Sequence, residues 1–246
     1  MKIIGVIPAR YGSTRFPGKP LVSLLGKPLI QWTIEGSRKS SLLDELIVAT
    51  DDKRIHDVAR GCGADVAMTA SDLPSGSDRI YAAIKDIDCD VVVNIQGDEP
   101  LVTGALIDRL AQVFVDDPTM DMATLAHPIS EEDLQSRNAV KVILNCKDEA
   151  IYFSRFPIPY SRVTAQELGS ETVCLKHIGM YAYSKKFLQR FCASPPAMIE
   201  QGESLEQLRA LYLGAKIKVV RVAEASIGVD TPEDLVKLEK MLSKGR

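Results

Sequence analysis

Residues 3–20 read IIGVIPARYGSTRFPGKP, an apolar run followed by a polar loop that carries three cations among glycine, serine and threonine. The apolar run predicts a strand at residues 3–7, so the loop begins at the carboxyl end of that strand. Open α/β sheets bind ligands at this edge. Guanidinium groups hold phosphate oxygens at two points, and glycine lets backbone N–H groups approach them. We therefore interpret the loop as a phosphate-binding loop, with a basic surface loop as the alternative.

Two common nucleotide-binding motifs do not fit this loop. A Walker loop reads G-x-x-x-x-G-K-[ST], with a hydroxyl residue after the lysine to hold Mg²⁺. Here five residues separate Gly12 from Gly18, and Pro20 follows Lys19. The glycines at residues 61–63 also lack the third glycine of a dinucleotide-binding fingerprint. The loop is thus a phosphate-binding candidate of another kind.

The rest of the first half alternates between strand and helix patterns. Apolar runs predict strands at 45–50, 65–68 and 90–95, and apolar residues at helical spacing predict helices at 29–39, 52–62, 77–87 and 103–115. The run at 90–95 contains three consecutive valines, as expected of a central parallel strand that is buried on both faces. This alternation predicts parallel strands joined by right-handed connections.

Beyond residue 120 the pattern changes to strands with short connections. We expect strands at 122–129, 140–145, 151–153, 174–183 and 216–222, helices at 184–192 and 204–213, and a loop at 157–170. The sequence TPED at 231–234 predicts that Thr231 caps a final helix, which runs to about residue 242. The expected fold class is α/β and Rossmann-like, with a mixed, mainly parallel sheet and a smaller mixed lobe.

The composition is that of a globular protein without the basic character of a nucleic-acid-binding protein. Apolar residues make up 46% of the chain and charged residues 26%, and the formal net charge is −3. The chain has no excess of basic residues of the kind that would indicate nucleic-acid binding. It also has no apolar run that would predict a membrane segment or a signal peptide. Five scattered cysteines without a C-x-x-C pair indicate reduced thiols and argue against a zinc site. We therefore expect a cytoplasmic protein.

Two aspartates are placed to bind a metal ion. Asp98 follows the apolar run at 90–95, so it should reach the same sheet edge as Arg10. Asp230 lies in a Gly-Val-Asp turn before the final helix. Mg²⁺ takes one or two protein carboxylates and fills its shell with water and substrate phosphates, and this pair meets that need. The alternatives are a turn residue for Asp98 and a helix-leading acid for Asp230, while Glu99 is a weaker candidate.

Distinct blocks of sequence run in order through nearly the whole chain: IPARYGSTRFPGKP at 7–20, SGSDR at 75–79, NIQGDEP at 94–100, YFSR at 152–155, KHIGMY at 176–181, EQLR at 206–209 and GVDTPED at 228–234. Together they resemble the 3-deoxy-manno-octulosonate (KDO) cytidylyltransferases, which have the fold of the nucleotide-diphospho-sugar transferases. The resemblance implies a single nucleotidyltransferase domain over residues 1–246. Within it, a nucleotide-binding core would cover about 1–120 and 215–246, and a lobe for sugar binding and dimerisation about 121–214.

The resemblance also implies an activity. The enzyme would join CTP to KDO, giving CMP-KDO and pyrophosphate for lipopolysaccharide biosynthesis, with Mg²⁺ as cofactor and a homodimer as the assembly. Catalysis would fall to the charged residues Arg10, Arg15, Lys19, Asp98 and Asp230, of which the two aspartates would bind the metal. The nucleotide would lie against Pro8, Ala9, Arg10, Ser13, Lys19, Ser75, Gly76, Arg79 and Gln96.

KDO carries a carboxylate and many hydroxyls, so its pocket needs a cation and several hydrogen-bonding side chains. The resemblance places the sugar against Arg15, Gln96, Arg155, His177, Tyr181, Glu206 and Gln207. Other interpretations stay open for some of these residues. His177 is also a candidate for a packed strand residue, and Ser204 with Gln207 for a capping box. Glu206 and Gln207 are expected to face away from the apolar stripe of their helix, which includes Tyr212.

Ser77 needs no ligand to explain it, because it is also a candidate for the N-cap of the helix that begins there.

Three rival functions remain at this stage. One is a cytidylyltransferase for a related acid sugar, either sialate or an amino-substituted KDO; the sialate loops usually end in Lys-Asn, whereas this loop reads Gly18-Lys19-Pro20. Another is an enzyme for sugar 1-phosphates, which typically open on a G-x-G-T-R loop that residues 8–10 do not match. The last is a non-catalytic sugar-nucleotide-binding protein on the same fold, which the presence of both candidate metal carboxylates disfavours.

Overall fold

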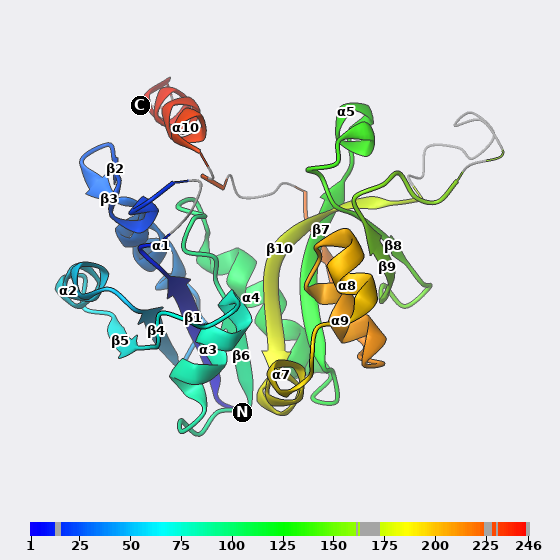
Figure 1. The fold of residues 1–246 in the computed structure, drawn as a ribbon, viewed down its shortest axis with the longest axis horizontal. Coiled ribbons are helices and arrows are strands. Elements are labelled where there is room, and N and C mark those ends of the chain that lie inside the picture. The colour runs from blue at the N-terminus through cyan, green and yellow to red at the C-terminus, as the bar shows by residue number, and fades with distance from the viewer. Residues whose placement is uncertain (13–15, 161, 163–172, 224–227, 230, 245–246) are drawn as a thin grey trace. The chain divides into compact units, whose positions relative to one another are not determined.

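The computed structural model describes residues 1–12, 16–160, 162, 173–223, 228–229 and 231–244 (Figure 1). The chain divides into two compact units, Met1–Val115 with Ser226–Arg246, and Asp116–Ala225. Each unit is described by itself. Three of the predicted site residues, Ser13, Arg15 and Asp230, lie outside the described residues.

The sheet of the first unit is parallel. Its strands β1 (Ile3–Ala9), β4 (Glu45–Thr50), β5 (Asp65–Met68) and β6 (Val91–Asn94) lie in the order β6-β1-β4-β5. The order runs outward from β1 through β4 to β5 and then returns to β6 on the other side of β1. The topological switch point therefore lies between β1 and β6, where open α/β sheets bind their ligands.

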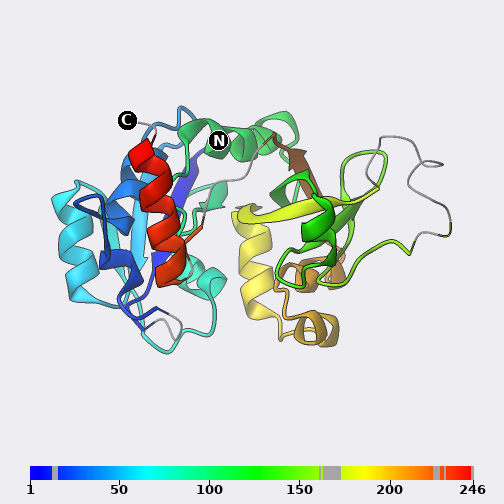
Figure 2. The same ribbon diagram turned by 90° about the horizontal axis from the view of Figure 1, so that it is seen from above.

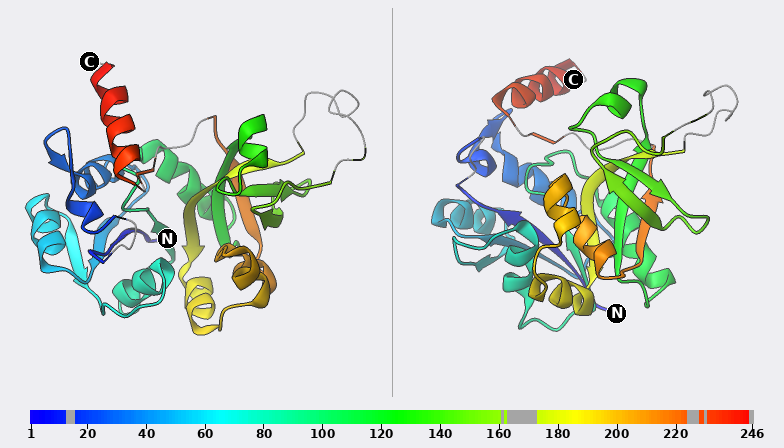
Figure 3. Two further views of the ribbon diagram at one scale, coloured as in Figure 1. Left: turned by 45° about the horizontal axis from the view of Figure 1, so that its top comes forward. Right: turned by 45° about the vertical axis from the view of Figure 1, so that its right-hand side comes forward.

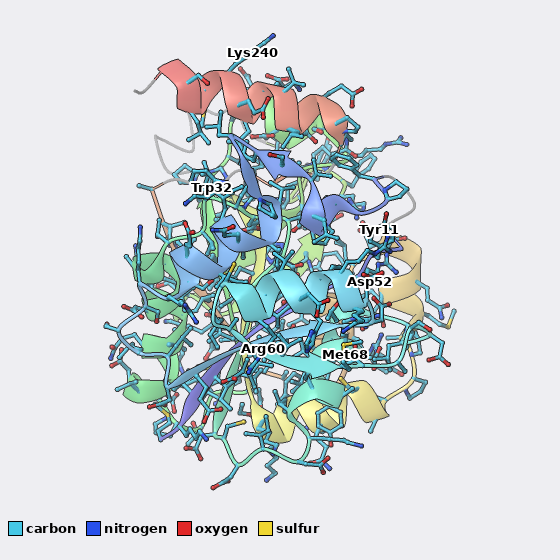
Figure 4. The ribbon with its side chains drawn as sticks, turned by 90° about the vertical axis from the view of Figure 1, so that its left-hand side faces the viewer. Tyr11, Trp32, Asp52, Arg60, Met68 and Lys240 are labelled. Atoms are coloured by element: carbon cyan, nitrogen blue, oxygen red, sulfur yellow. The ribbon has the colours of Figure 1, made fainter. Side chains whose placement is uncertain are left out.

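The strands of this sheet are buried because helices cover both of its faces. The helices are α1 (Leu29–Ser37), α2 (Lys53–Gly61), α3 (Gly76–Ile84) and α4 (Gly104–Asp116). In Figure 4, α2 and α3 lie on opposite sides of the strands. Val92 and Val93 are completely buried, which explains why β6 shows no polar alternation. These elements confirm the predicted α/β class, with boundaries that shift by a few residues.

A small apolar cluster joins the C-terminal helix to the segment after the first loop. The 3-10 helix η1 (Lys19–Leu21) leads into the hairpin of β2 (Ser23–Leu24) and β3 (Lys27–Pro28), against which α10 (Pro232–Lys244) lies (Figures 1 and 2). The buried members of the cluster are Leu24, Leu29, Val229 and Leu238. The hydroxyl of Thr231 accepts a hydrogen bond from the backbone N–H of Asp234 (3.2 Å), as the predicted cap requires.

The second unit is built on mixed strands. β10 (Leu175–Ser184) pairs antiparallel with β7 (Met122–Pro128), and β11 (Ile217–Arg221) pairs parallel with β7. β8 (Lys141–Leu144) pairs antiparallel with both β10 and β9 (Ala150–Ser154). The unit also contains α5 (Glu131–Gln135), α7 (Lys185–Ala193), α8 (Met198–Glu203) and α9 (Gln207–Tyr212), and Figure 3 shows the last three on one side of its strands.

The prediction for residues 204–213 was partly wrong. Ser204 ends α8 in a left-handed conformation (φ 52°), so it cannot form a capping box with Gln207. Gln207 is only 4% exposed, whereas Tyr212, assigned to the apolar stripe, is 73% exposed. Periodicity failed here because α9 is short and is packed on more than one side, so no single stripe marks its buried face.

All five cysteines are free thiols, as expected. Across the part of the chain that the structure describes, no helix has both the length and the apolar character that a bilayer crossing requires.

Candidate active site

A cavity of ≈ 250 Å³ lies in the first unit at the switch point of the sheet. Three segments that are far apart in the sequence line it, namely the loop after β1, the segment that enters α3 and the loop after β6. The lining residues are Pro8, Ala9, Arg10, Lys19, Pro20, Leu73, Pro74, Ser75, Gly76, Arg79, Gln96, Gly97 and Asp98. The structure thus brings together the described residues that were predicted to bind the nucleotide.

The polar end of the cavity is formed by opposite charges. Lys19 Nζ lies 2.7 Å from Asp98 Oδ2, and the two side chains are 13% and 31% exposed. Arg10, which is exposed, lines the same cavity. The backbone N–H of Val229 donates to the carbonyl of Asp98 (2.8 Å), so the segment before α10 is fixed at this point. Cations and a carboxylate therefore share one partly buried cavity, as triphosphate binding requires.

The loops around the cavity pack closely because two glycines occur where side chains would not fit. A Cβ on Gly97 would lie 3.0 Å from the carbonyl oxygen of Pro8, so it would push apart the segments after β1 and β6. Gly18 has φ 69° and donates its N–H to the carbonyl of Tyr11 (2.9 Å). The Tyr11 ring in turn lies 3.5 Å from the guanidinium carbon of Arg54 on α2. In Figure 4, Tyr11 lies near the end of α2 marked by Asp52.

The N-terminus of α3 contributes partial positive charge to the cavity. Ser75 is the N-cap: its hydroxyl accepts from the N–H of Asp78 (3.1 Å). This corrects the alternative that Ser77 caps the helix, since Ser77 lies within the first turn and is 1% exposed. Ser75 and Gly76 line the cavity, and the first N–H groups of a helix carry partial positive charge that favours anions.

Arg79 and Gln96 reach the cavity but also make bonds within the protein. Arg79 is 3% exposed, and its guanidinium forms an ion pair with Asp51 (3.2 Å). Gln96 Nε2 donates to Asn94 Oδ1 (3.4 Å). The ion pair with Asp51 therefore holds Arg79 in a buried position, whereas Arg10 is exposed to solvent.

The donor set fits a divalent cation of the Mg²⁺ type. Asp98 offers a carboxylate that lines the cavity and is partly exposed. Within the described residues, no group of three or more His, Cys, Asp or Glu side chains gathers as a metal cage would. Mg²⁺ typically binds through one or two carboxylates plus substrate phosphates, so a lone carboxylate beside phosphate-binding cations is compatible with it.

In the second unit, His177, which is buried, and Tyr181, which is partly buried, form part of an aromatic group on β10. Their ring centroids are 5.5 Å apart, and Phe153 packs edge-on against His177 at 4.9 Å. Burial lowers the pKa of His177 to about 3, so the ring is neutral. Burial, reinforced by the charge of Glu206, raises the pKa of the Tyr181 phenol. Both groups therefore act as neutral hydrogen-bonding partners and not as ions.

The ring of His177 is oriented by a residue that the sequence did not single out. Thr124 Oγ1 lies 2.9 Å from His177 Nε2 and donates to the carbonyl of Met180 (2.8 Å). The hydroxyl thereby links the imidazole of His177 to the backbone of β10. The register of β10 against β7 shifts between Ile178 and Tyr181, which turns this carbonyl toward Thr124. The sequence carries one signal of this bulge, Gly179, because an isolated glycine inside a strand pattern often marks such an irregularity.

The side chain of Arg155 makes its described hydrogen bonds to backbone carbonyls. Its guanidinium donates to Glu203 (2.8 Å), Ser204 (3.2 Å) and Arg137 (3.1 Å). It thereby holds the turn that precedes Glu206. The second unit contains Arg155, His177, Tyr181, Glu206 and Gln207, and their role in sugar binding stays a prediction.

Lys141 was also missed by sequence reasoning. It is fully buried, and its ammonium donates to the carbonyls of Ser136 (2.6 Å), Ala139 (2.9 Å) and Arg155 (3.0 Å). Burial lowers its pKa. A lysine at the start of a predicted strand gives no signal of this kind, because two of its acceptors lie in the turn before the strand and the third follows β9.

Comparison with known proteins identifies a family and close relatives. Residues 4–217 match the model of the cytidylyltransferase family. A 3-deoxy-manno-octulosonate cytidylyltransferase of Bdellovibrio bacteriovorus is 75% identical over 99% of this chain and 98% of its own length. The corresponding protein of Geobacter sulfurreducens is 44% identical over 98% of this chain and 100% of its own length.

Solved structures agree with these relatives. A CMP:2-keto-3-deoxy-manno-octonic acid synthetase, solved in complex with CTP, superposes with a TM-score of 0.94 at 41% identity and covers 100% of both chains. A 4-diphosphocytidyl-2C-methyl-D-erythritol synthase of Anaerococcus prevotii gives a TM-score of 0.65 at 14% identity over 98% of this chain and 99% of its own, which shows a shared fold alone. The chain belongs to the cytidylyltransferase family, among the 3-deoxy-manno-octulosonate cytidylyltransferases.

Proposed function

We propose that this protein transfers CMP from CTP to KDO, giving CMP-KDO and pyrophosphate. The observation that carries the proposal is the cavity at the switch point, where Arg10 and Lys19 meet the Asp98 carboxylate. The anomeric hydroxyl of the sugar attacks the α-phosphorus of CTP, the bond to pyrophosphate breaks in line, and the hydroxyl loses its proton. Such a transfer requires positioning and charge neutralisation more than covalent help from the protein.

The charged residues of the cavity divide the work. Lys19 and Arg10 hold the phosphates and offset the charge that develops on the leaving pyrophosphate. Asp98 holds Mg²⁺, with Asp230 proposed as the second carboxylate and Arg15 and Ser13 as further phosphate contacts. Held there, Mg²⁺ would supply positive charge that offsets the phosphate charge and favours loss of the proton from the sugar hydroxyl. Support for Mg²⁺ comes from the donor set at Asp98.

The sugar assignment rests on the relatives. The relatives with 75% and 44% identity are cytidylyltransferases for KDO, and the similar solved structure is a complex with CTP. We propose the following residues as sugar-binding: Gln96, Arg155, His177, Tyr181, Glu206 and Gln207. A neutral His177 and a neutral Tyr181 suit hydroxyl groups, which need partners that both donate and accept.

We further propose a homodimer, which the resemblance to the family suggests, and a cytoplasmic location, which suits five free thiols. Sedimentation analysis at several protein concentrations tests the dimer directly.

The test of the function is a matrix of substrates. The purified protein is incubated with Mg²⁺, with CTP or UTP, and with KDO, amino-substituted KDO or sialate, while released pyrophosphate is measured. We expect the highest kcat/KM for CTP with KDO. Faster turnover of another acid sugar would reassign the substrate. Calorimetric binding of CTP without turnover of any sugar would instead support a non-catalytic sugar-nucleotide-binding protein.

A further inference from the structure

The loop of residues 70–75, which forms a wall of the cavity, is held at its start by the buried side chain of Arg79 and ends at the helix that carries this residue. The guanidinium of Arg79 donates to Thr69 Oγ1 and to the carbonyl of Ala70 (3.2 Å), where the loop begins. The backbone N–H of Arg79 donates to the carbonyl of Ser75 (3.2 Å), where the loop ends. The bond to Ser75 is the first backbone hydrogen bond of α3, so the guanidinium of Arg79 ties the start of the loop to the helix at which the loop ends.

Asp51 holds that guanidinium in place. Its Oδ2 lies 3.2 Å from Arg79 Nη2, and the side chains of Arg79 and Asp51 are 4% and 13% exposed. Asp51 Oδ1 is buried and accepts no hydrogen bond from the residues that the structure describes. Removing one partner of a buried ion pair leaves the charge of the other uncompensated, so the two side chains depend on each other. Asp51 follows β4 directly and is not among the described residues that line the cavity.

The wall itself offers a ligand mainly backbone polar groups. The side chains of Leu73 and Pro74 are apolar, and Gly76 has none. The hydroxyl of Ser75 is engaged with Asp78, because it accepts from the backbone N–H (3.1 Å) and donates to the carboxylate (2.8 Å). Backbone N–H and carbonyl groups are positioned by the conformation of the loop, not by the identity of its side chains.

Fixed backbone groups can discriminate between pyrimidine bases. A carbonyl placed to accept from the amino group of cytosine faces a like carbonyl oxygen in uracil, which leaves two acceptors opposed. A site built to hydrogen-bond one substituent rejects an analogue that lacks it far better than an apolar pocket can. This discrimination is lost if the loop can move by a fraction of the length of a hydrogen bond.

We propose that Asp51 and Arg79 form a positioning device that sets base selectivity: the buried pair fixes residues 70–75 so that their backbone selects cytosine. The inference rests on the proposed function and deepens it. It assigns to Asp51, which does not line the cavity, a role in choosing CTP over UTP, and it makes Arg79 a positioning residue.

The test compares three variants with an exposed ion pair as control. Asp51→Asn keeps the shape of the side chain and removes its charge. Arg79→Lys keeps the charge but loses the planar fork of donors. Thr69→Val removes one acceptor and leaves the ion pair intact, which provides a milder change if either of the others fails to fold. The control variants Asp65→Asn and Arg60→Lys alter a pair at 3.0 Å whose side chains are 74% and 56% exposed. In Figure 4, Arg60 lies at the end of α2 away from Tyr11.

For Asp51→Asn and Arg79→Lys, we expect KM for CTP to rise about tenfold with kcat within about threefold of the wild type. The ratio of kcat/KM for CTP over UTP should fall by about tenfold, in line with the loss of one oriented hydrogen bond. Thr69→Val should shift both quantities in the same direction by a smaller factor. The Kd for CTP, measured by calorimetry without sugar, should follow KM, and both control variants should match the wild type.

Two results would overturn the inference. One is a lower melting temperature with KM and base selectivity unchanged, which would make the pair purely structural. The other is an equal change in the control variants. Neither result bears on the proposed function, which fails only if the wild-type protein makes no CMP-KDO.

Discussion

Charged side chains do different work in the two units of this chain. In the first unit, Lys19 and Asp98 line a cavity and keep 13% and 31% of their side-chain surface exposed. In the second unit, Arg209 and Glu200 form a pair at 2.5 Å, with 9% and 11% exposed, and Arg209 also stacks on Phe191. Accessible charges at the ends of parallel strands can meet a substrate, whereas enclosed charges with a full set of partners hold the fold together.

The largest effect should come from breaking the enclosed pair. Glu200→Gln removes the partner of a buried guanidinium and should lower the free energy of unfolding by about 3 kcal/mol. Urea denaturation measures this loss. The kcat of the folded variant should equal that of the wild type. A stable but inactive Glu200→Gln protein would contradict the view that this pair holds the fold and takes no part in the reaction.

Asp98→Asn should give the opposite pattern. Losing one well-placed electrostatic group in an active site costs at least ~10²-fold in turnover. We expect that loss in kcat at limiting Mg²⁺, with an unfolding free energy within about 1 kcal/mol of the wild type, because the Lys19 pair is partly exposed. Asp86→Asn, on the surface, is the matched control. Unchanged turnover in Asp98→Asn would remove this residue from the metal site.

Lys19→Ala tests the comparison of cavity charges with surface charges at the end of the cavity that is proposed to bind the phosphates. The change should raise KM for CTP about tenfold, the effect of losing one charge-assisted hydrogen bond to a phosphate. Lys27→Ala serves as control, since Lys27 also pairs with a carboxylate at 2.7 Å but is 43% exposed and lies outside the described cavity lining. If both variants raised KM equally, the effect would reflect net charge and not the cavity.

The most gradual effect, spread over several pH units, concerns the pH dependence of stability. Burial lowers the pKa of His177 to about 3, whereas an unfolded histidine titrates near ~6.5. Between these values the unfolded chain binds a proton that the folded chain excludes, so stability falls as pH drops from 6.5 toward 3, by up to about 1.4 kcal/mol per unit. His177→Gln should reduce this slope in denaturation curves recorded from pH 7 to pH 4.

His127 provides a graded comparison for that slope. Burial also lowers its pKa, but it is less enclosed, so His127→Gln should change the slope by less. Equal slopes in the wild type and in His177→Gln would show that the imidazole is not excluded from protonation in the folded state.

The sequence predicted the nucleotide side of the site well, for a physical reason. Strands β1 and β6 are runs of buried apolar residues, and parallel strands end at a common edge, so Arg10, Lys19 and Asp98 had to converge there. The same rule also points to Asp51, which follows β4 at that edge. It was missed because no motif surrounds it, and its partner Arg79 lies on a helix whose packing the sequence does not specify.

The second unit was harder to predict because its polar contacts arise between segments without periodic patterns. Thr124 meets His177 through an irregular register of β10, and Lys141 meets carbonyls of the turn before β8 and of Arg155 after β9. The elements α5 and α8 and the hairpin β2–β3 are short, so their patterns contain too few residues to show a period. The conformation of such short elements is decided by tertiary contacts and not by local sequence patterns.

The most direct test is a crystal structure of the protein grown with CTP and Mg²⁺. We predict that the phosphates contact Lys19 and Arg10, that the metal binds Asp98, and that the base lies against residues 73–76. A triphosphate bound outside this cavity, or a metal that leaves Asp98 without a ligand contact, would contradict the account.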